Sequence, residues 1–370
     1  MRYKLGDICS RLSSGKGISA KLISSTGNFP VYGGNGLRGY TEKSNFAGEC
    51  AIIGRQGAFC GNVRFFSGEA YMTEHAVVVC ADENNDTRYL AYLLGAMNLG
   101  RLSGQSAQPG LSVKVLAQQE IDMPSLEQQK KVSSILALIE DKIELNNKIN
   151  KNLEQQAQAI YAKMFAENKT TTPATIADVS INVTDGVHNT VHDDPTGEYL
   201  LLSCKNIKGG SLNIGSLERR INIETFEKLR RRTKLAKGDI LISSVGTVGE
   251  LLLLNEEPFN YEFQRSVAMV KPNPNIVSPA YLYESLIFKR SELINAAHGA
   301  VQQCLFIADI AGFPIEVPQQ TDLLKFDAIV TPMLDIISAN ENENHKLAEI
   351  RDSLLPKLMS GELDVTDLDL

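Results

Sequence analysis

The chain lacks the long apolar stretches and paired cysteines that mark membrane, secreted and many metal-binding proteins. None of its 370 residues lies in an uninterrupted apolar run of about 18 residues, and the N-terminus MRYKLGDICSRLSSG has no apolar signal core. We therefore expect a cytoplasmic protein with no membrane segment. The six cysteines form no CxxC pair, so we expect buried small hydrophobic residues rather than zinc ligands or disulfides.

Common catalytic motifs are missing as well. The sequence has no P-loop GxxxxGK[ST], no HExxH and no GxSxG. Gly34, Gly36 and Gly39 spell GxGxxG, but YTEKSNFAGE follows them in place of the helix that a dinucleotide site requires. His188 and His192 have a helical metal-ligand spacing, yet DGVHNTVHDDPTG is typical of turns and predicts a polar loop. We expect no catalytic, cofactor or metal site in this chain.

The net charge of −7 argues at first against a nucleic-acid partner. Most of the negative charge lies near the C-terminus, because residues 319–370 hold 4 basic and 11 acidic residues. Residues 1–124 hold 12 basic and 10 acidic residues, and residues 219–238 are rich in Lys and Arg. Local fields rather than net charge decide phosphate binding, so double-stranded DNA stays open as a partner.

The most informative feature that is present is a duplication. Residues 121–165 match residues 315–359 at a constant shift of 194, and a second shift of 171 pairs Gly15 with Gly186. A period this long indicates a tandem duplication of one unit, a globular module followed by a long helix, rather than a solenoid. A duplicated binder is suited to reading two separated places at once.

Two long helices are predicted from the absence of breakers and from the apolar period. The segment from Ser125 to about Phe165 contains no Pro or Gly, and some forty residues at 1.5 Å rise give a rod of roughly 60 Å. Its single stripe needs a partner, for which the second copy, at about 320–359, is the candidate. The predicted stripe comprises Val132, Ile135, Ile139, Ile143, Asn146, Ile149, Leu153, Gln156, Ile160 and Met164.

Polar residues and breakers add detail to this pair of helices. Asn146 and Asn147 could fix the register of a coiled coil, as a polar residue at a seam position does. In the second copy, Thr331 and Pro332 predict a kink or a restart of the helix. Gly361 is predicted to end it.

Between the helices, the sequence has the period of strands and turns. NFPVYGGNGLRGY and EHAVVVC in the first module, and EYLLLSCKNI and SVAMVKPN in the second, are short β-rich runs punctuated by Gly and Asn. A helical stretch follows in each module. We predict an α/β (α+β) fold in which two modules with twisted, largely antiparallel sheets are joined by two long antiparallel coiled-coil helices. The predicted boundaries are 1–124 for the first module, 125–168 for the central helix, 169–318 for the second module, 319–360 for the C-terminal helix and 361–370 for an acidic tail.

Several segments carry family motifs in a fixed order. YKLGDICSRLSSGKG and TIADVSINVTDGVHNT open the two modules, FPVYGGNGLRGYTEKSNF precedes IIGRQGAFCGNV, and GDILISSVGTVG is the counterpart in the second module. MPSLEQQKKVSSIL begins the first long helix, and LLPKLMSGELDV ends the second. With these motifs the chain resembles, end to end, the specificity (S) subunits of bacterial type I restriction-modification systems. The second helix departs from the family pattern, because it begins VPQQTDLLKF and carries Pro332.

The resemblance implies a DNA-recognition subunit that performs no catalysis itself. Each module would be a target-recognition domain for one half of a bipartite, asymmetric DNA site. The antiparallel helices would set the spacer length and dock two methyltransferase (M) subunits, which bind S-adenosylmethionine and methylate adenine. Motor and nuclease (R) subunits, which use ATP and Mg, would join through the M subunits.

Two other classes of function stay open from the residues alone. A structural scaffold that binds protein partners along the coiled coil fits the acidic tail and the negative net charge. An enzyme whose site forms across the two modules would need partners for His75, His298 and His345 that are distant in sequence.

Candidate DNA contacts follow from the chemistry of the duplex. Phosphates need cations or backbone amides, bases need forked or amide side chains on loops, and Gly-rich turns let the backbone approach closely. Any one of these residues could instead be a solvated loop residue. In the first module the candidates are Lys16, Asn35, Arg38, Tyr40, Arg55, Gln56 and Gln108. In the second module they are His188, Asn189, Lys205, Asn206, Ser244, Thr247, Gln264, Arg265 and Gln302, with Arg230, Arg231 and Arg232 for phosphates.

Overall fold

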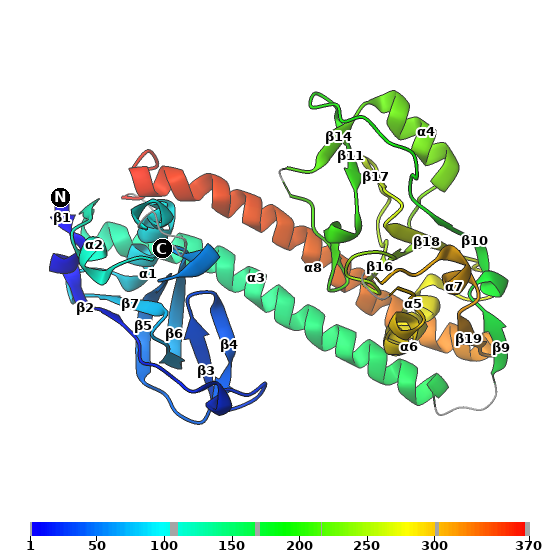
Figure 1. Cartoon of the computed structure of the whole chain (residues 1–370), viewed down its shortest axis with the longest axis horizontal. Helices are drawn as coiled ribbons and strands as arrows, with labels where there is room; N and C mark the ends of the chain where they lie inside the picture. Colours follow the sequence, from blue (N-terminus) through cyan, green and yellow to red (C-terminus); the bar gives the residue numbers. More distant parts are fainter. Residues whose placement is uncertain (1, 104–109, 167–170, 216, 300–302, 367–370) are drawn as a thin grey trace. The chain divides into compact units, whose positions relative to one another are not determined.

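The computed structural model describes residues 2–103, 110–166, 171–215, 217–299 and 303–366, and it divides the chain into two compact units. Unit 1 comprises Met1–Ile143 with His345–Leu370, and unit 2 comprises Glu144–Asn344. Each unit holds one module and a stretch of both long helices, α3 (Leu126–Tyr161) and α8 (Gln320–Ser360) (Figure 1). The boundary between the two units falls within each long helix, because the units are defined by packing and not by secondary structure.

Unit 1 contains the first module. Its elements are β1 (Arg2–Lys4), η1 (Leu5–Ile8), β2 (Cys9–Ser14), η2 (Ala20–Leu22), β3 (Phe29–Gly33), β4 (Gly36–Thr41), β5 (Phe46–Gly54), η3 (Gly57–Phe59), β6 (Val63–Met72), β7 (Ala76–Ala81), α1 (Thr87–Ala96), η4 (Leu99–Leu102), α2 (Val113–Ala117) and β8 (Glu120–Asp122). Six strands form a sheet with the order β2-β7-β5-β6-β3-β4, and β1 pairs with β8. All neighbours are antiparallel except β3 and β6.

The central strands of this sheet are buried on both faces, which explains their uninterrupted apolar sequence. In β7, Val77 and Val79 belong to the core that α1 covers, whereas Val78 belongs to a second core on the other face. Leu136 of α3 and Leu358 of α8 join the first of these cores. The sheet of the first module is therefore packed against both long helices within unit 1.

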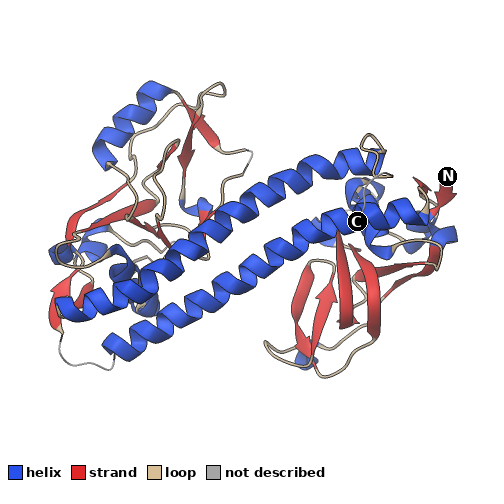
Figure 2. Ribbon diagram, turned by 180° about the vertical axis from the view of Figure 1, so that it is seen from behind, coloured by secondary structure: helices blue, strands red, loops and turns tan. Residues whose placement is uncertain are grey.

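Unit 2 contains the second module. Its elements are the π-helical turn Ala162–Ala166, β9 (Thr172–Thr175), η6 (Ala177–Val179), β10 (Ser180–Asp185), β11 (Tyr199–Leu202), η7 (Cys204–Asn206), β12 (Ile207–Lys208), β13 (Ser211–Leu212), β14 (Arg219–Ile221), α4 (Ile223–Thr233), β15 (Ile240–Ser243), β16 (Leu251–Leu253), β17 (Tyr261–Phe263), β18 (Val267–Pro272), α5 (Pro279–Phe288), α6 (Arg290–Asn295), α7 (Ile307–Ala311) and β19 (Pro314–Val317). Its sheets have the orders β10-β18-β15-β16, β14-β11-β17, β12-β13 and β19-β9. Figure 2 shows the helices and strands of both modules, and the predicted fold class is confirmed.

The two modules repeat one topology, as the duplication predicts. Tyr3 of β1 lies opposite Ile121 of β8, and Ala174 of β9 lies opposite Ile315 of β19. The same shifts of 171 and 194 residues relate these two pairs. The strand order β2-β7-β5-β6 corresponds to β10-β18-β15-β16. The parallel pair β3–β6 corresponds to β11–β17, so two strands of the second module, β16 and β17, both match β6.

One glycine is required at the same point of each module. Gly15 follows β2 and Gly186 follows β10. A Cβ atom at either position would overlap a backbone carbonyl, that of Met72 at Gly15 and that of Phe263 at Gly186. The pairing of these glycines in the sequence therefore reflects a close backbone approach that both modules share.

The long helices pack antiparallel in both units. In unit 2, Asn146 Nδ2 donates to Asn344 Oδ1 at 2.9 Å, and Asn340 Nδ2 donates to Asn150 Oδ1 at 2.7 Å. In unit 1, Lys131 Nζ of α3 donates at 2.6 Å to the carbonyl of Thr366, beyond the end of α8. Asn146 thus lies at the seam, as predicted. None of the described helices has the length and apolarity needed to cross a membrane.

The predicted stripe on α3 needs correction in its C-terminal half. Ile149 and Gln156 are exposed, whereas Asn150 and Ala157, one residue further on, are buried. Asn150 hydrogen-bonds across the seam, and Ala157 packs in the core of unit 2. Counting apolar residues missed this because asparagine can occupy a seam when α8 supplies matching amides.

The predicted restart of the helix at Pro332 is also wrong, because α8 is one helix from Gln320 to Ser360. Proline removes the hydrogen bond to the carbonyl four residues earlier, here that of Ala328. Both residues are exposed, so solvent is at hand for that carbonyl. The helix ends at Gly361, as predicted, where φ is +75°.

A buried carboxyl group lies where α5 meets α3 in unit 2. Glu284 is only 3% exposed, and its carboxylate accepts a hydrogen bond from the Gln158 amide. Burial raises the pKa of Glu284 to about 7, and the nearby Glu154 adds to the rise. Glu341 of α8 also has a pKa raised by burial and by Glu154.

We expect Glu284 to make the stability of unit 2 depend on pH. Between its unfolded pKa and about 7 the folded chain binds more protons, so the free energy of unfolding falls as pH rises through this window. Above pH 7 the free energy of unfolding should be about 2–4 kcal/mol lower than it is below the unfolded pKa of Glu284. Glu284→Gln should remove this share of the fall, as measured by urea unfolding at pH 5 and pH 8. An equal fall in both proteins would contradict the assignment to Glu284.

Candidate nucleic-acid interface

Loops of the first module meet at the ends of β2, β3, β5 and β6. We call residues 14–17, 33–38, 54–57, 64 and 72–76 loop cluster 1. The Lys16 N–H donates to the Met72 carbonyl at 2.9 Å, and the Arg55 N–H donates to the His75 carbonyl at 3.0 Å. The Arg55 carbonyl accepts from the Leu111 N–H at 2.9 Å. The backbone of Arg55 is therefore held from both sides.

A glycine-rich hairpin forms the centre of loop cluster 1. β3 ends at Gly33 and β4 begins at Gly36, whose φ of +97° favours glycine. The GxGxxG sequence is therefore a hairpin between strands and opens no helix. A Cβ atom at Gly33 would lie 2.8 Å from Cδ of Arg38, and one at Gly36 would overlap the guanidinium of Arg64. Two arginine side chains thus lie against the hairpin.

The second module holds an equivalent set of loops. We call residues 185–188, 203–206, 243–247, 264–266 and 304–306 loop cluster 2. The Ser244 N–H donates to the Ser266 carbonyl at 2.9 Å, and the Ser244 carbonyl accepts from the Leu305 N–H at 2.9 Å. These bonds match those of Arg55, so Ser244 occupies the position of Arg55 in the second module. One backbone framework thus carries different side chains in the two modules.

Most of the predicted DNA contacts lie in or beside these clusters. Gln108 and Gln302 fall outside the described residues. Tyr40, Arg55 and Gln264 are half-buried. The exposed candidates are Lys16, Asn35, Arg38, Gln56, His188, Asn189, Lys205, Thr247 and Arg265. Nothing in the structure tests which of them bind DNA, so they stay predictions.

Two of the predicted contacts need correction because their side chains are buried. Asn206 is 1% exposed, its Oδ1 accepts from the Ser203 N–H at 2.9 Å, and its Nδ2 donates to the Asn213 carbonyl at 2.8 Å. Ser244 is 3% exposed, and its hydroxyl lies 3.3 Å from the Arg265 carbonyl. These side chains hold the loops in shape and are not free to meet a base.

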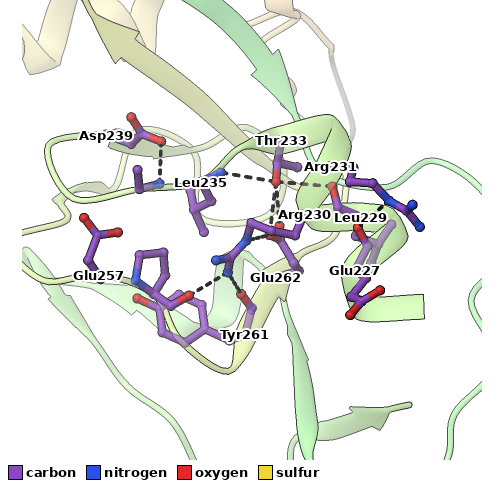
Figure 3. Close-up of polar contacts among 12 residues, drawn as sticks. Glu227, Leu229, Arg230, Arg231, Thr233, Leu235, Asp239, Glu257, Tyr261 and Glu262 are labelled. Carbon is purple, nitrogen blue, oxygen red and sulfur yellow. Dashed lines mark hydrogen bonds and ion pairs between the residues drawn. The ribbon is translucent and has the colours of Figure 1, made fainter. Parts of the chain in front are cut away.

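Arg230 also has a structural role in place of the predicted phosphate contact. Its guanidinium donates to the Pro258 carbonyl at 2.7 Å and the Tyr261 carbonyl at 2.9 Å, and it pairs with Glu262 (Figure 3). The Glu262 side chain is 0% exposed and also accepts from the Thr233 hydroxyl at 3.0 Å. Burial raises the pKa of Glu262, and Arg230 opposes the rise.

The other two arginines of this run differ from each other. Arg232 donates through Nη2 to the Asp185 carbonyl at 2.6 Å and to the Gly186 carbonyl, so it braces the start of loop cluster 2. Arg231 is exposed on α4, and its Nε lies 3.3 Å from the Glu227 carbonyl. Arg231 therefore remains a candidate phosphate contact.

Arg64 is a candidate that the sequence did not reveal. It lies on β6, is exposed, and reaches the hairpin through Gly36. In the sequence it is one residue of the strand-like run NVRFF, where a charged side chain indicates only the solvent face. The tertiary packing brings its guanidinium against Gly36.

Among the described residues, no group of three His, Cys, Asp or Glu side chains could hold a metal ion. Burial raises the pKa of the Cys9 and Cys50 thiols to about 12, which keeps them protonated and poorly nucleophilic. His188 is exposed and lies 2.6 Å from Asp185, the last residue of β10, whose side chain is 15% exposed.

Comparisons with known proteins give a consistent result. Residues 1–155 match the family described as type I restriction modification DNA specificity domain. The EcoprrI specificity subunit of Escherichia coli is 41% identical over 139 residues, 36% of this chain and 34% of that protein. The MjaIX specificity subunit of Methanocaldococcus jannaschii is 27% identical over 317 residues, 76% of this chain and 70% of that protein. The match thus spans about a third of the length of the Escherichia coli relative.

A solved structure supports the fold. The type I restriction-modification S subunit from M. genitalium superposes with a TM-score of 0.66 at 16% identity, covering 97% of this chain and 95% of that one. At this identity the likeness concerns the fold alone. The family match over residues 1–155, the relatives in sequence and this fold agree, and the chain is similar to the specificity subunits of type I restriction-modification systems.

Proposed function

We propose that this chain is the non-catalytic DNA-recognition subunit of a type I restriction-modification enzyme, in which each module reads one half of a bipartite, asymmetric site. The observation that supports the proposal is that both modules have the same backbone framework in their loop clusters. Arg55 lies in loop cluster 1, and Ser244 lies at the equivalent position of loop cluster 2. A shared scaffold with different side chains is suited to reading two different short sequences.

The partners follow from the same proposal. Two methyltransferase subunits would supply the S-adenosylmethionine site, and motor subunits joined through them would supply the ATP and Mg sites. The complex would work in the cytoplasm. This chain would contribute the sequence preference and the spacing between the half-sites.

The long helices offer apolar surface for docking the methyltransferase subunits. In unit 2, Leu145 and Ile149 of α3 are exposed and lie four residues apart. Ile329 and Ile336 of α8 are exposed and lie seven residues apart. Apolar side chains at these spacings share one helical face, which is how helices recognise helical partners.

The proposal predicts a bipartite methylation motif. The chain assembled with its methyltransferase subunits should methylate adenine in one motif of two short blocks around a gap of fixed length. Mapping of methylated adenines in treated DNA would show this motif. The chain alone, supplied with S-adenosylmethionine, should transfer no methyl group. Methylation that ignores sequence, or a continuous motif, would refute the proposal.

A protein scaffold is the competing function, because the exposed apolar positions would serve other partners equally well. Salt dependence separates the two functions. DNA recognition requires the logarithm of the affinity to fall linearly with the logarithm of salt, by about 0.9 for each phosphate neutralised. A scaffold would show no sequence-specific DNA binding at any salt concentration.

A further inference from the structure

Within the described residues, the four Lys and Arg side chains of loop cluster 1 have no carboxylate partner. Lys16, Arg38 and Arg64 are exposed, and no described residue forms an ion pair or a side-chain hydrogen bond with them. Among the described residues, the Arg55 side chain has one polar contact, from Nη1 to the Ser14 hydroxyl at 3.4 Å. The acidic residue of the cluster, Glu74, pairs with His75 at 3.3 Å.

These cations surround backbone that can approach a duplex closely. Arg38 and Arg64 lie against the glycine hairpin, and the backbone of Arg55 lies beside Gly34, whose Cβ position would be 3.5 Å from the Arg55 nitrogen. Loop cluster 1 is therefore a basic surface around a bare backbone turn.

Two of the three basic side chains of loop cluster 2 lie beside a carboxylate. His188 lies 2.6 Å from Asp185, and Lys205 lies 2.9 Å from Glu218. Arg265 is exposed, and it alone among the basic side chains of the cluster lacks a carboxylate partner within the part of the chain that the structure describes. The same backbone framework thus presents much less free positive charge in the second module.

We propose that the two half-sites are bound through different interactions. The first module provides most of the phosphate neutralisation, and the second binds mainly through neutral hydrogen-bond donors. The inference rests on the proposed DNA-recognition function. A paired cation brings its carboxylate along with it, so the net charge presented to the phosphates stays near zero. Counterion release on binding, and with it the salt dependence, then comes chiefly from loop cluster 1.

Two matched double variants test the division of labour. Arg38→Gln with Arg64→Gln removes two free cations from the first module, and Lys205→Gln with Arg265→Gln removes one paired and one free cation from the second. Each variant chain would be assembled with the methyltransferase subunits. The complex would then be titrated, at several salt concentrations, with DNA that carries the motif found by methylation mapping. The first pair should lower the slope of log affinity against log salt by about 2, and the second by at most about 1. Thermal melts monitored by circular dichroism check that both variants fold.

The outcomes separate this inference from the proposed function. If the wild-type complex shows no bipartite motif, the proposed function fails. If the motif is bipartite but the second double variant lowers the salt slope as much as the first, the inference that the first module provides most of the phosphate neutralisation is wrong. Arg231→Gln on α4 adds a further check, because a slope loss near 1 for this one variant would place substantial phosphate binding in the second module.

Discussion

Replacing Arg230 by methionine should lower the free energy of unfolding of unit 2 by about 3–5 kcal/mol. Glu262 is fully buried, and the guanidinium of Arg230 is its charged partner. Without it, the carboxylate keeps the Thr233 hydroxyl but loses the countercharge, and the carbonyls of Pro258 and Tyr261 lose a donor. Urea unfolding followed by circular dichroism measures the loss.

The pH dependence and a double variant identify the cause of that loss. Burial already raises the pKa of Glu262, and removal of Arg230 should raise it further. The folded variant then binds a proton that the unfolded chain has released, so its stability falls as pH rises above the unfolded pKa. The loss should be smaller at pH 5 than at pH 8, and Glu262→Gln in the same chain should restore part of it. A loss independent of pH and unchanged in the double variant would refute the charge argument.

Lengthening the long helices should change the gap between the two methylated blocks. Seven residues inserted between Lys148 and Ile149 of α3, and seven between Glu341 and Asn342 of α8, would add about two turns to each helix and roughly 10 Å of length. The insertions fall between the asparagine pairs Asn146–Asn344 and Asn150–Asn340, so both pairs can form again. If the helices set the spacer, the gap should grow by about three base pairs.

Methylation mapping of the variant complex measures this change, and activity on the original motif should be lost. Insertion into one helix alone is the matched control, because it disrupts the asparagine pairing and should abolish recognition of both spacings. An unchanged gap in the double insertion would mean that the helices do not set the spacer.

The sequence was informative wherever periodicity and duplication determine structure. Both long helices, the repeated module and the strand-rich character of each module were predicted, and the shifts of 171 and 194 residues reappear as equivalent strand pairings. The repeated glycine at positions 15 and 186 also has a clear structural cause. These features depend on local propensity and on the comparison of the chain with itself.

The direction of individual side chains could not be predicted from the sequence. Asn35 and Asn206 both lie in polar segments between strands, but the Asn206 side chain is buried and caps the short helix η7, whereas Asn35 is exposed. Arg230 and Arg231 are adjacent, yet α4 directs one toward buried Glu262 and the other toward solvent. A helical rotation of about 100° per residue separates such neighbours, and only packing decides which of them is buried.

The sequence by itself determined that one module-and-helix unit occurs twice, because a duplication is visible without knowing any contact. Only the tertiary structure decided which residues meet: the asparagines across the seam, the arginines around the hairpin, and the free or paired state of each cation in the loop clusters. These contacts join residues tens to hundreds of positions apart. Their formation depends on how strands and helices pack, and a local pattern in the chain does not encode that packing.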